Sequence, residues 1–292
     1  MIIVTGATGF LGRFVVNELL ALDLEFRCLV RKTSNTDFLS EKSVDRVEGD
    51  LDYPETLINA FSGCSILINL ASLGFGHAEG IIHAAEVSGI KRAIFISTTA
   101  VFTTLPAESK KIRLAAEEAI QGSQLEYTIL RPTMIYGTSN DRNMARLIRF
   151  VNKYPLVPVF GRGSSLIQPI YVEDLAKAVV KVLQNDRETV YKAYNLAGEK
   201  PISYSEAVEV VGRVLGKKAR RLNLPVELVL FLLRLYRMVS GKSVFTEEQV
   251  LRLQEDKAFS FKEAEADFAF SSRSFEEGIK MEIDIMRMKG LI

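Results

Sequence analysis

Residues 1–21 read MIIVTGATGFLGRFVVNELLA, and this stretch decides the fold. It opens with a short β-branched run, Ile2–Thr5, which leads directly into the glycine-rich turn GATGFLG at residues 6–12. A segment with helical periodicity, Phe10–Ala21, begins inside that turn. A strand that turns sharply through glycines into a helix is typical of the first unit of a parallel α/β sheet.

The same alternation of strand and helix continues through the first half of the chain. Strands that are apolar almost throughout indicate a sheet covered by helices on both faces. The pattern therefore predicts the α/β class with an open, doubly wound parallel sheet. The expected strands are Ile2–Thr5, Phe26–Val30, Val44–Glu48, Ile66–Leu70, Ala93–Ser97 and Tyr127–Arg131, and the expected helices are Phe10–Ala21, Pro54–Phe61, Ala78–Ser88 and Glu108–Gln121.

The second half of the chain has a less regular order. A basic amphipathic segment, Asn143–Lys153, precedes a proline-rich stretch and a turn at Gly161 and Gly163. We expect residues 1–150 to form the sheet domain, and residues 151–292 to form a smaller mixed α/β cap with segments that return to the core. Further strands are expected at Leu166–Val172 and Ala193–Leu196, and helices at Glu173–Gln184, Tyr204–Leu215, Pro225–Ser240, Glu247–Gln254 and Ser274–Met288.

Composition excludes several classes of protein. The 292 residues are 48% hydrophobic, and 37 Lys and Arg balance 36 Asp and Glu, so overall charge does not favour nucleic acid. The N-terminus lacks signal-peptide features, and the longest apolar stretch, Leu224–Leu233, is shorter than the roughly 20 residues of a membrane span. Cys28 and Cys64 lack the spacing of zinc or disulfide sites, which favours a reducing, cytoplasmic setting.

The glycines of the first turn suit a pyrophosphate. Gly6 permits a tight turn, Gly9 lets a phosphate approach the backbone, and Gly12 lets the helix lie close to the sheet. The free N–H groups at the start of the helix, together with its dipole, favour negative charge. The alternative is a glycine-rich turn that binds nothing. Phosphate binding is favoured, because strand, loop and helix agree in the first unit of the chain.

Several motifs resemble the short-chain dehydrogenase/reductase superfamily, and most of all its extended or atypical branch of nucleotide-sugar epimerases, dehydratases and reductases. They are TGATGFLG at the N-terminus, EGDLDYPETL at 48–57, ISTTAVF at 96–102, LRPTMIYG at 130–137 and QPIYVEDLAKAV at 168–179. The likeness continues through YNLAGEKPISYSEAVEVVGRVLGK and DFAFSSRSFEEGI, so it covers nearly the whole chain. This resemblance implies a Rossmann sheet that binds NAD or NADP, and it does not specify a substrate.

Two cations, Arg31 and Lys32, follow the second expected strand, where enzymes that prefer NAD usually carry an acidic residue. An arginine can bind a 2′-phosphate through two charge-assisted hydrogen bonds, so NADP(H) is favoured over NAD. Both cations are alternatively ordinary solvated loop charges.

The resemblance implies cofactor contacts at several further places, of which Asp50 is alternatively a helix cap and Leu70 and Ala71 are alternatively core. The full set of expected cofactor residues is Gly6, Thr8, Gly9, Phe10, Leu11, Gly12, Arg31, Lys32, Asp50, Leu51, Leu70, Ala71, Ser97, Pro132 and Thr133.

Relatives in this superfamily use a Ser or Thr after the fifth strand and a Tyr-x-x-x-Lys on the next helix. A phenol with a pKa near 10 exchanges a proton readily only when a nearby ammonium lowers that pKa. Thr98 matches the first position, and the segment LAAEEAI places Ser109 at the tyrosine and Arg113 at the lysine. Thr98, Ser109 and Arg113 are therefore the expected catalytic positions, but the usual proton relay is absent.

Two pairs of residues have alternative interpretations. Tyr136 and Tyr171 are candidate substitutes for the missing phenol, although tyrosines in apolar stretches usually pack in a core. His77 and His83 are six residues apart and have no cluster of further ligands, so no metal site is expected. In a minority hypothesis His77 reaches the rim of the ligand crevice.

Two basic segments also have alternative interpretations. Arg142, Arg146 and Arg149 share one face of a helix, so they either bind a nucleotide-sugar diphosphate or are solvated. The segment Lys217–Lys242 combines KKARR with an apolar helix. We expect it to be a cap helix buried against the sheet, and the less favoured alternative is a helix that lies on an anionic membrane surface.

The sequence predicts a cytoplasmic NADP(H)-binding oxidoreductase or epimerase-like enzyme that acts on a nucleotide-sugar or a similar polar carbonyl compound. The absent Tyr-x-x-x-Lys supports an alternative, a non-catalytic dinucleotide-binding sensor or assembly protein. The expected partner is a small-molecule substrate, and a homodimer is a further hypothesis. Neither nucleic acid nor a membrane surface is expected as a partner.

Overall fold

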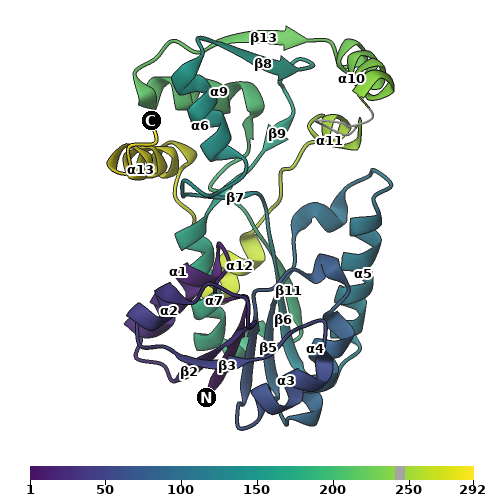
Figure 1. Ribbon diagram of the computed structural model, residues 1–292, viewed down its shortest axis with the longest axis vertical. Coiled ribbons are helices and arrows are strands. Elements are labelled where there is room, and N and C mark those ends of the chain that lie inside the picture. Colours follow the sequence, from purple (N-terminus) through teal and green to yellow (C-terminus); the bar gives the residue numbers. More distant parts are fainter. Residues whose placement is uncertain (241–246) are drawn as a thin grey trace.

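The computed structural model describes residues 1–240 and 247–292. Its centre is a sheet of seven strands in the order β11-β6-β5-β4-β1-β2-β3, in which all neighbouring strands are parallel (Figure 1). This confirms the predicted α/β class and the doubly wound parallel sheet. The strands are β1 (Ile2–Thr5), β2 (Phe26–Val30), β3 (Asp45–Glu48), β4 (Ile66–Asn69), β5 (Arg92–Ile96), β6 (Glu126–Pro132) and β11 (Lys192–Leu196).

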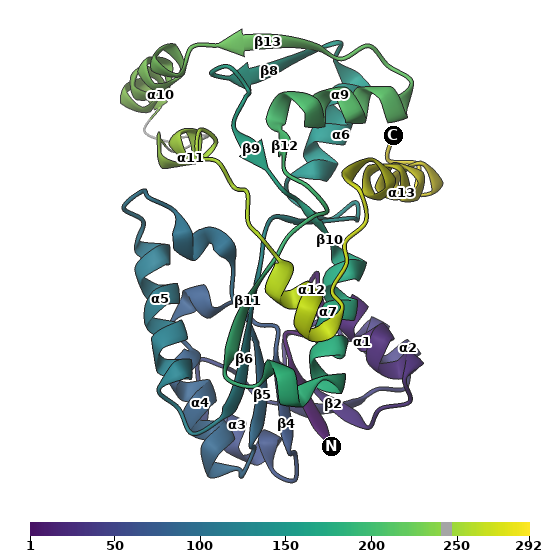
Figure 2. The ribbon, with the colours of Figure 1, turned by 180° about the vertical axis from the view of Figure 1, so that it is seen from behind.

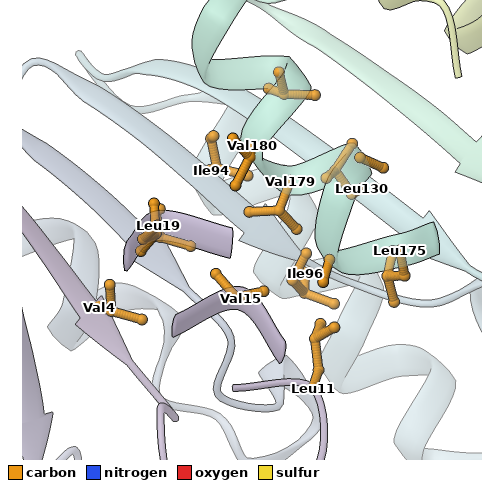
Figure 3. Packing of buried hydrophobic residues seen from close by; sticks show 14 of the residues in the cluster. Val4, Leu11, Val15, Leu19, Ile94, Ile96, Leu130, Leu175, Val179 and Val180 are labelled. Atoms are coloured by element: carbon orange, nitrogen blue, oxygen red, sulfur yellow. The ribbon is translucent and has the colours of Figure 1, made fainter. Parts of the chain in front are cut away.

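Alternate residues of each strand face two different helix layers, because successive side chains point to opposite faces of a sheet. Val4 faces α1 (Gly12–Ala21) and α7 (Val172–Gln184), and Figure 3 shows it among Val15, Leu19 and Val179. Ile3 faces the second layer, which consists of α3 (Pro54–Phe61), α4 (Ala78–Val87) and α5 (Glu108–Gln121). The sheet is therefore buried on both faces, as apolar parallel strands require.

A second body stands over the carboxyl ends of the strands (Figures 1 and 2). It has its own apolar cluster, which includes Tyr136, Ile148, Val159 and Val211. We call this body the cap. Its elements are β7 (Ile135–Tyr136), α6 (Met144–Lys153), β8 (Leu156–Phe160), β9 (Leu166–Ile167), β10 (Ile170–Tyr171), β12 (Ile202–Ser203), α9 (Tyr204–Leu215), β13 (Arg220–Leu224), α10 (Val226–Ser240), α11 (Glu247–Arg252) and α13 (Phe275–Met288).

The chain passes between the two bodies more than once. After β10 it returns to the sheet as α7, α8 (Asp186–Thr189) and β11, which pairs with β6 at the sheet edge. After α11 it returns again as α12 (Lys262–Phe268), which packs beside β11 and α7. The guanidinium of Arg273 then joins α7 to the start of α13 through Asp174, with Nη2 to Oδ1 at 2.7 Å.

The second half differs from the sequence prediction at two places. The expected strand Leu166–Val172 is divided into β9 and β10, because Pro169 lacks the N–H group that a continuous ladder needs. The proline-rich stretch, for which no strand was predicted, forms β8, which pairs in parallel with β13. Pro158 is accommodated there because β8 is an edge strand.

The expectation that the apolar helix after residue 224 is buried against the sheet is also wrong. β13 pairs with β8 at the end of the cap that is remote from the sheet, so α10 begins there (Figures 1 and 2). Its main described neighbour is α11. Phe231 on this helix is 61% exposed. Among the described residues, no helix combines the length and the hydropathy that crossing a membrane would require.

A buried carboxyl group in the cap should give the protein a pH-dependent stability. Glu282 is fully buried, and burial, assisted by the nearby Asp141, raises its pKa from 4.5 to about 10. The folded state therefore keeps a proton that the unfolded state releases above about pH 4.5, so stability is highest at low pH and falls as pH rises toward 10.

We expect Glu282→Gln, which removes this titration, to become more stable than the wild type as pH rises from 5 to 8. The slope for one such group is about 1.4 kcal/mol per pH unit, and the measured effect will be smaller where the buried site relaxes. Urea unfolding at several pH values measures the difference. Glu276→Gln, an exposed change on the same helix, is the control, and parallel stability curves for wild type and Glu282→Gln would contradict the assignment.

Candidate functional site

The strand order reverses beside β1, and this point opens a crevice at the carboxyl ends of the strands. α1 follows β1 on one face of the sheet, whereas α4 follows β4 on the other, and ligands of such sheets bind between the two connections. A cavity of about 590 Å³ lies at this place, and we call it the crevice. Among the residues that line it are Thr5, Gly6, Thr8, Gly9, Arg31, Ser34, Asp50, Leu51, Leu70, Ala71 and His77.

Gly6 and Gly12 shape the floor of the crevice. Gly6 has a φ of +69°, and a Cβ atom there would lie 2.8 Å from the backbone nitrogen of Ala71. A Cβ atom on Gly12 would overlap the backbone carbonyl oxygens of Gly6 and Ala7. No side chain caps the first turn of α1 at Leu11, so its N–H groups are available to an anion. A pyrophosphate fits this turn.

A smaller hollow of about 280 Å³ adjoins the crevice after β2. Arg31 and Ser34 line both, and Lys32 and Arg46 complete a group of three cations around the hollow. One carboxylate, Glu48, also lines it. The net positive charge and the serine hydroxyl suit a phosphate group.

Four of the expected cofactor residues line the other side of the crevice. Asp50 and Leu51 follow β3, and Leu70 and Ala71 follow β4. The carboxylate of Asp50 accepts the N–H of Asp52 at 3.2 Å, so it organises its own turn and does not cap the following helix. The structure therefore brings these four residues to the same cavity as the glycine turn.

Three expected cofactor residues have side chains that point elsewhere. Phe10 packs against the core and Phe14, and Leu11 is buried in the layer under α1. The hydroxyl of Ser97 donates to the carboxylate of Glu117, which forms an ion pair with Arg131. Only the backbones of Phe10 and Leu11 belong to the turn around the crevice.

A second cavity of about 560 Å³ lies next to the crevice, at the carboxyl ends of β5 and β6. Arg142 lines the crevice and its neighbour Asn143 lines the second cavity, so the two spaces are adjacent. Thr98 and Thr133 also line the second cavity, and Pro132 is buried directly before Thr133. Thr98 and Thr133 therefore border one space, and the hydroxyl of Thr133 donates to the carbonyl oxygen of Gln168 at 2.5 Å.

Ser109 and Arg113, which stand at the relay positions, line neither cavity. Nη1 of Arg113 donates to the carbonyl oxygen of Ser109 at 3.3 Å, and its guanidinium lies against Gly74. Burial and the nearby Arg252 lower the pKa of Arg113. The structure does not bring these two residues together with Thr98.

Tyr136 and Tyr171 belong to the core of the cap. Their rings meet edge to face with centroids 5.4 Å apart, and both side chains are buried. The hydroxyl of Tyr171 donates to the carbonyl oxygen of Gly137 at 3.3 Å. Burial raises the pKa of both phenols, so neither is suited to exchange a proton with a ligand.

Lys257 is a further residue of the second cavity that no sequence motif indicates. It lines the second cavity together with Thr98 and Glu255. Burial lowers its pKa; Glu255 opposes this shift and Arg252 adds to it. The irregular segment around Lys257 carries no motif, and a lone lysine in such a segment looks like a solvated charge.

The two histidines lie in different environments. Nε2 of His77 is 3.6 Å from the Asp52 carboxylate at the edge of the crevice, whereas His83 is exposed on α4. Within residues 1–240 and 247–292, no group of three or more His, Cys, Asp or Glu residues is arranged to hold a metal ion.

The three arginines on and before α6 do not form one ligand-binding surface. Arg142 lines the crevice, but Nη2 of Arg149 donates to the carbonyl oxygen of Ser139 at 2.7 Å. Arg146 is exposed and lines neither cavity. Only Arg142 is placed to meet a ligand in the crevice.

The glycine turn, the uncapped helix and the crevice at the reversal of strand order define a dinucleotide-binding protein with a Rossmann fold. The chain belongs to the NAD(P)H-binding family, whose sequence model matches residues 6–186. This confirms the predicted resemblance at the level of the superfamily.

Three curated relatives have different described roles. The chain is 28% identical over 240 residues to NADH dehydrogenase [ubiquinone] 1 alpha subcomplex subunit 9, mitochondrial, from Arabidopsis thaliana, a match that covers 76% of this chain but only 60% of that protein. It is 29% identical to ceramide reductase from Caulobacter vibrioides, covering 77% and 74% of the two chains. It is 27% identical to photosystem II assembly factor Ycf39 from Guillardia theta, covering 79% and 75%.

The fold is shared with solved epimerase structures. UDP-glucuronic acid 4-epimerase from Bacillus cereus, solved in complex with UDP-glucuronic acid and NAD, superposes with a TM-score of 0.77 over 99% of both chains. The identity of 17% limits this likeness to the fold.

Proposed function

We propose that the protein is a cytoplasmic NADP(H)-dependent reductase or epimerase-like enzyme of the atypical short-chain type, and that its substrate is a polar carbonyl compound. The observation that carries this proposal is the succession of three neighbouring spaces: the cation-lined hollow, the crevice over the glycine turn and the threonine-lined second cavity. They match in order a ribose phosphate, a pyrophosphate and a reacting carbonyl group.

The hollow after β2 supports NADP(H) over NAD(H). A 2′-phosphate carries nearly two negative charges, and Arg31 and Lys32 with Arg46 supply cations around the space beside the crevice. A carboxylate suited to the 2′-hydroxyl of NAD is absent at position 31, where the chain has arginine. The pyrophosphate would lie over Gly6 and Gly9.

The second cavity supplies groups that act on a carbonyl oxygen. NADPH, when bound, supplies the hydride for the carbonyl carbon. Oγ1 of Thr98 accepts the N–H of Ala100 at 3.2 Å, so its hydroxyl hydrogen is free to bond to a substrate oxygen. Lys257 supplies the proton, because its lowered pKa makes its ammonium a better acid than that of an exposed lysine.

A nucleotide-sugar is the first substrate class to test. The hydroxyl groups of Thr98, Thr103 and Thr104 give the second cavity a polar wall, and Arg142 lines the neighbouring crevice. The Bacillus cereus epimerase with the same fold was solved with a nucleotide-sugar, and ceramide reductase is a relative whose name describes reduction. Both support a reaction of the carbonyl class.

The second candidate function is a non-catalytic dinucleotide-binding sensor or assembly protein. Ser109 and Arg113 replace the usual relay and line neither cavity, which is the observation that favours it. Photosystem II assembly factor Ycf39, a relative at 27% identity, supports the same alternative.

Two measurements on the purified protein separate the two functions. Calorimetric titration with NADPH and NADH tests the crevice, and consumption of NADPH with a panel of nucleotide-sugars and simpler carbonyl compounds tests the second cavity. Binding with turnover supports the reductase. Tight binding without turnover of any compound favours the sensor, and no heat with either coenzyme contradicts both.

Arg31→Asp should separate the two coenzymes. We expect its affinity for NADPH to fall by about 10- to 100-fold, the loss of a charge-assisted contact worth roughly 1.5–3 kcal/mol, while its affinity for NADH changes little. Lys42→Asp makes the same charge change at an exposed site that lines neither the crevice nor the hollow. Equal weakening of both coenzymes by Arg31→Asp would show that Arg31 does not read the 2′-phosphate.

A further inference from the structure

α10 presents a row of large apolar side chains to water. Leu228, Phe231, Leu232 and Leu235 are 47%, 61%, 51% and 49% exposed. Their spacing of three, four and seven residues places all four on one side of the helix. Scattered exposed leucines are ordinary in proteins, but an unbroken row of this kind marks a contact surface.

The opposite side of α10 is the side that packs on the protein. Val226, Val229, Leu230 and Leu233 have the same helical spacing and are all less exposed than the outer row. Their position on the helix lies nearly opposite the outer row. The helix therefore packs through this inner row, and the apolar side chains of the outer row are not needed for that packing.

An ion pair connects α10 to α11. Arg234 donates from Nε and Nη2 to the two carboxylate oxygens of Glu247 at 3.1 and 2.8 Å, which joins α10 to α11. This pair is partly exposed to solvent, so it links the two helices without covering the outer row.

Further exposed leucines lie on two strands at the same end of the cap. Leu156 on β8 and Leu222 on β13 are also exposed, and the register of the two strands places both on the face opposite the buried Val157 and Val159 of β8. Figures 1 and 2 place β8, β13 and α10 together at the end of the cap remote from the sheet. We call this surface the distal face, formed by Leu156, Leu222, Leu228, Phe231, Leu232 and Leu235.

Basic residues border the distal face. The sequence KKARR places Lys217, Lys218, Arg220 and Arg221 directly before and within β13, and all four are exposed. Between residues 217 and 236 the sequence contains a single acidic residue, Glu227. Lys217 and Arg221 also bond to other residues of the cap, so substituting them would disturb the cap itself. Lys218 and Arg220 are therefore the cations to substitute.

We propose that the distal face docks on an anionic phospholipid surface, with its leucines and Phe231 among the upper acyl chains and the KKARR cations at the headgroups. An apolar row that lies beside a basic border is the combination that binds such interfaces. A second copy of this chain would bring the same cations together, which opposes pairing through this face. The crevice lies between the sheet and the cap, away from the distal face, so this inference is independent of the proposed function.

The chain contains no tryptophan, so Phe231→Trp places a single fluorescent reporter on the distal face. We expect its emission to shift to shorter wavelength with vesicles of phosphatidylcholine and phosphatidylglycerol, and to be quenched when the lipids carry bromine in their upper acyl chains. Leu22→Trp, at an exposed leucine after α1, is the matched control and should show neither change. A Phe231→Trp spectrum unaffected by these vesicles would overturn the proposal.

Sedimentation of the unlabelled full chain with the same vesicles provides a second readout. We expect binding to fall at least about tenfold in the double variant Phe231→Ser and Leu235→Ser, given the apolar area removed. Binding should fall similarly with Lys218→Gln and Arg220→Gln, and on raising the salt concentration. The double variant Leu22→Ser and Leu24→Ser, which removes two exposed leucines beside the amino ends of the strands, should bind as the wild type does.

Coenzyme titration verifies that each variant is folded. Sedimentation velocity without vesicles distinguishes a second copy as the occupant: a wild-type dimer that Phe231→Ser and Leu235→Ser dissociates would overturn the lipid proposal. Equal binding of wild type and this variant to the anionic vesicles would also overturn it.

Discussion

The Gly6→Ala variant is expected to lose at least about tenfold in affinity for NADPH and to be markedly less stable than the wild type. Alanine at a φ of +69° costs roughly 1–2 kcal/mol, and its methyl group would press on the backbone of Ala71 and Leu70, where overpacking typically adds about 1–3 kcal/mol. Relief of that overlap must move β1 away from β4 and so distort the crevice. Urea unfolding and calorimetric titration measure the two effects.

Gly89→Ala is a matched control for this experiment. Gly89 has a φ of +79°, but a Cβ atom there would meet nothing within 4 Å. Both variants therefore have the unfavourable backbone conformation, and only Gly6→Ala has the overlap. Similar losses of stability in the two variants, with NADPH affinity retained in both, would show that close contact between the turn and β4 is unimportant.

Lys257→Met is expected to lower kcat for carbonyl reduction by about 10²–10⁴-fold, the usual contribution of a positioned acid, with a much smaller change in KM. Methionine keeps the length of the side chain and removes the proton. In the wild type the rate should fall as pH rises through the pKa of Lys257, which burial holds below its ordinary value of 10.5. The variant should lack that limb of the pH profile.

Lys111→Met is the control, because Lys111 is exposed on α5 and pairs with Glu108. If Lys257→Met retains kcat and the fall in rate at alkaline pH, Lys257 is excluded as the proton donor, and Thr98 becomes the candidate. Coenzyme affinity, measured separately, should be nearly the same in all three proteins, since Lys257 does not line the crevice.

The sheet and its cofactor crevice could be predicted from sequence because their signals are local. β1, the glycine turn and α1 are consecutive, and each strand of the first half shows its burial in its own apolar run. The ends of the six predicted strands in this half differ from the observed ones by at most one residue. The residues after each strand then meet at one edge, because all these strands are parallel.

The second cavity and the cap could not be predicted in the same way. Lys257 lines the same cavity as Thr98 only because a segment far along the chain returns to the carboxyl end of β5, and no local pattern encodes that return. The position of α10 depends on the pairing of β13 with β8. The sequence does not predict this pairing, because a proline within β8 is atypical of a strand. Ser109 and Arg113 occupy the positions of a relay that this chain lacks, and α5 places the guanidinium of Arg113 against Gly74.

The return of the chain to the sheet after the cap has begun has a practical consequence for dissecting the protein. A fragment that stops at residue 150 would lack β11 and α7, so the edge of β6 would be left without its neighbour, and Val15 and Leu19 would lose their cover. Such a fragment is expected to aggregate through that bare edge when expressed alone. The smallest autonomous unit must therefore include α7 and β11, and limited proteolysis of the whole chain should release no stable amino-terminal half.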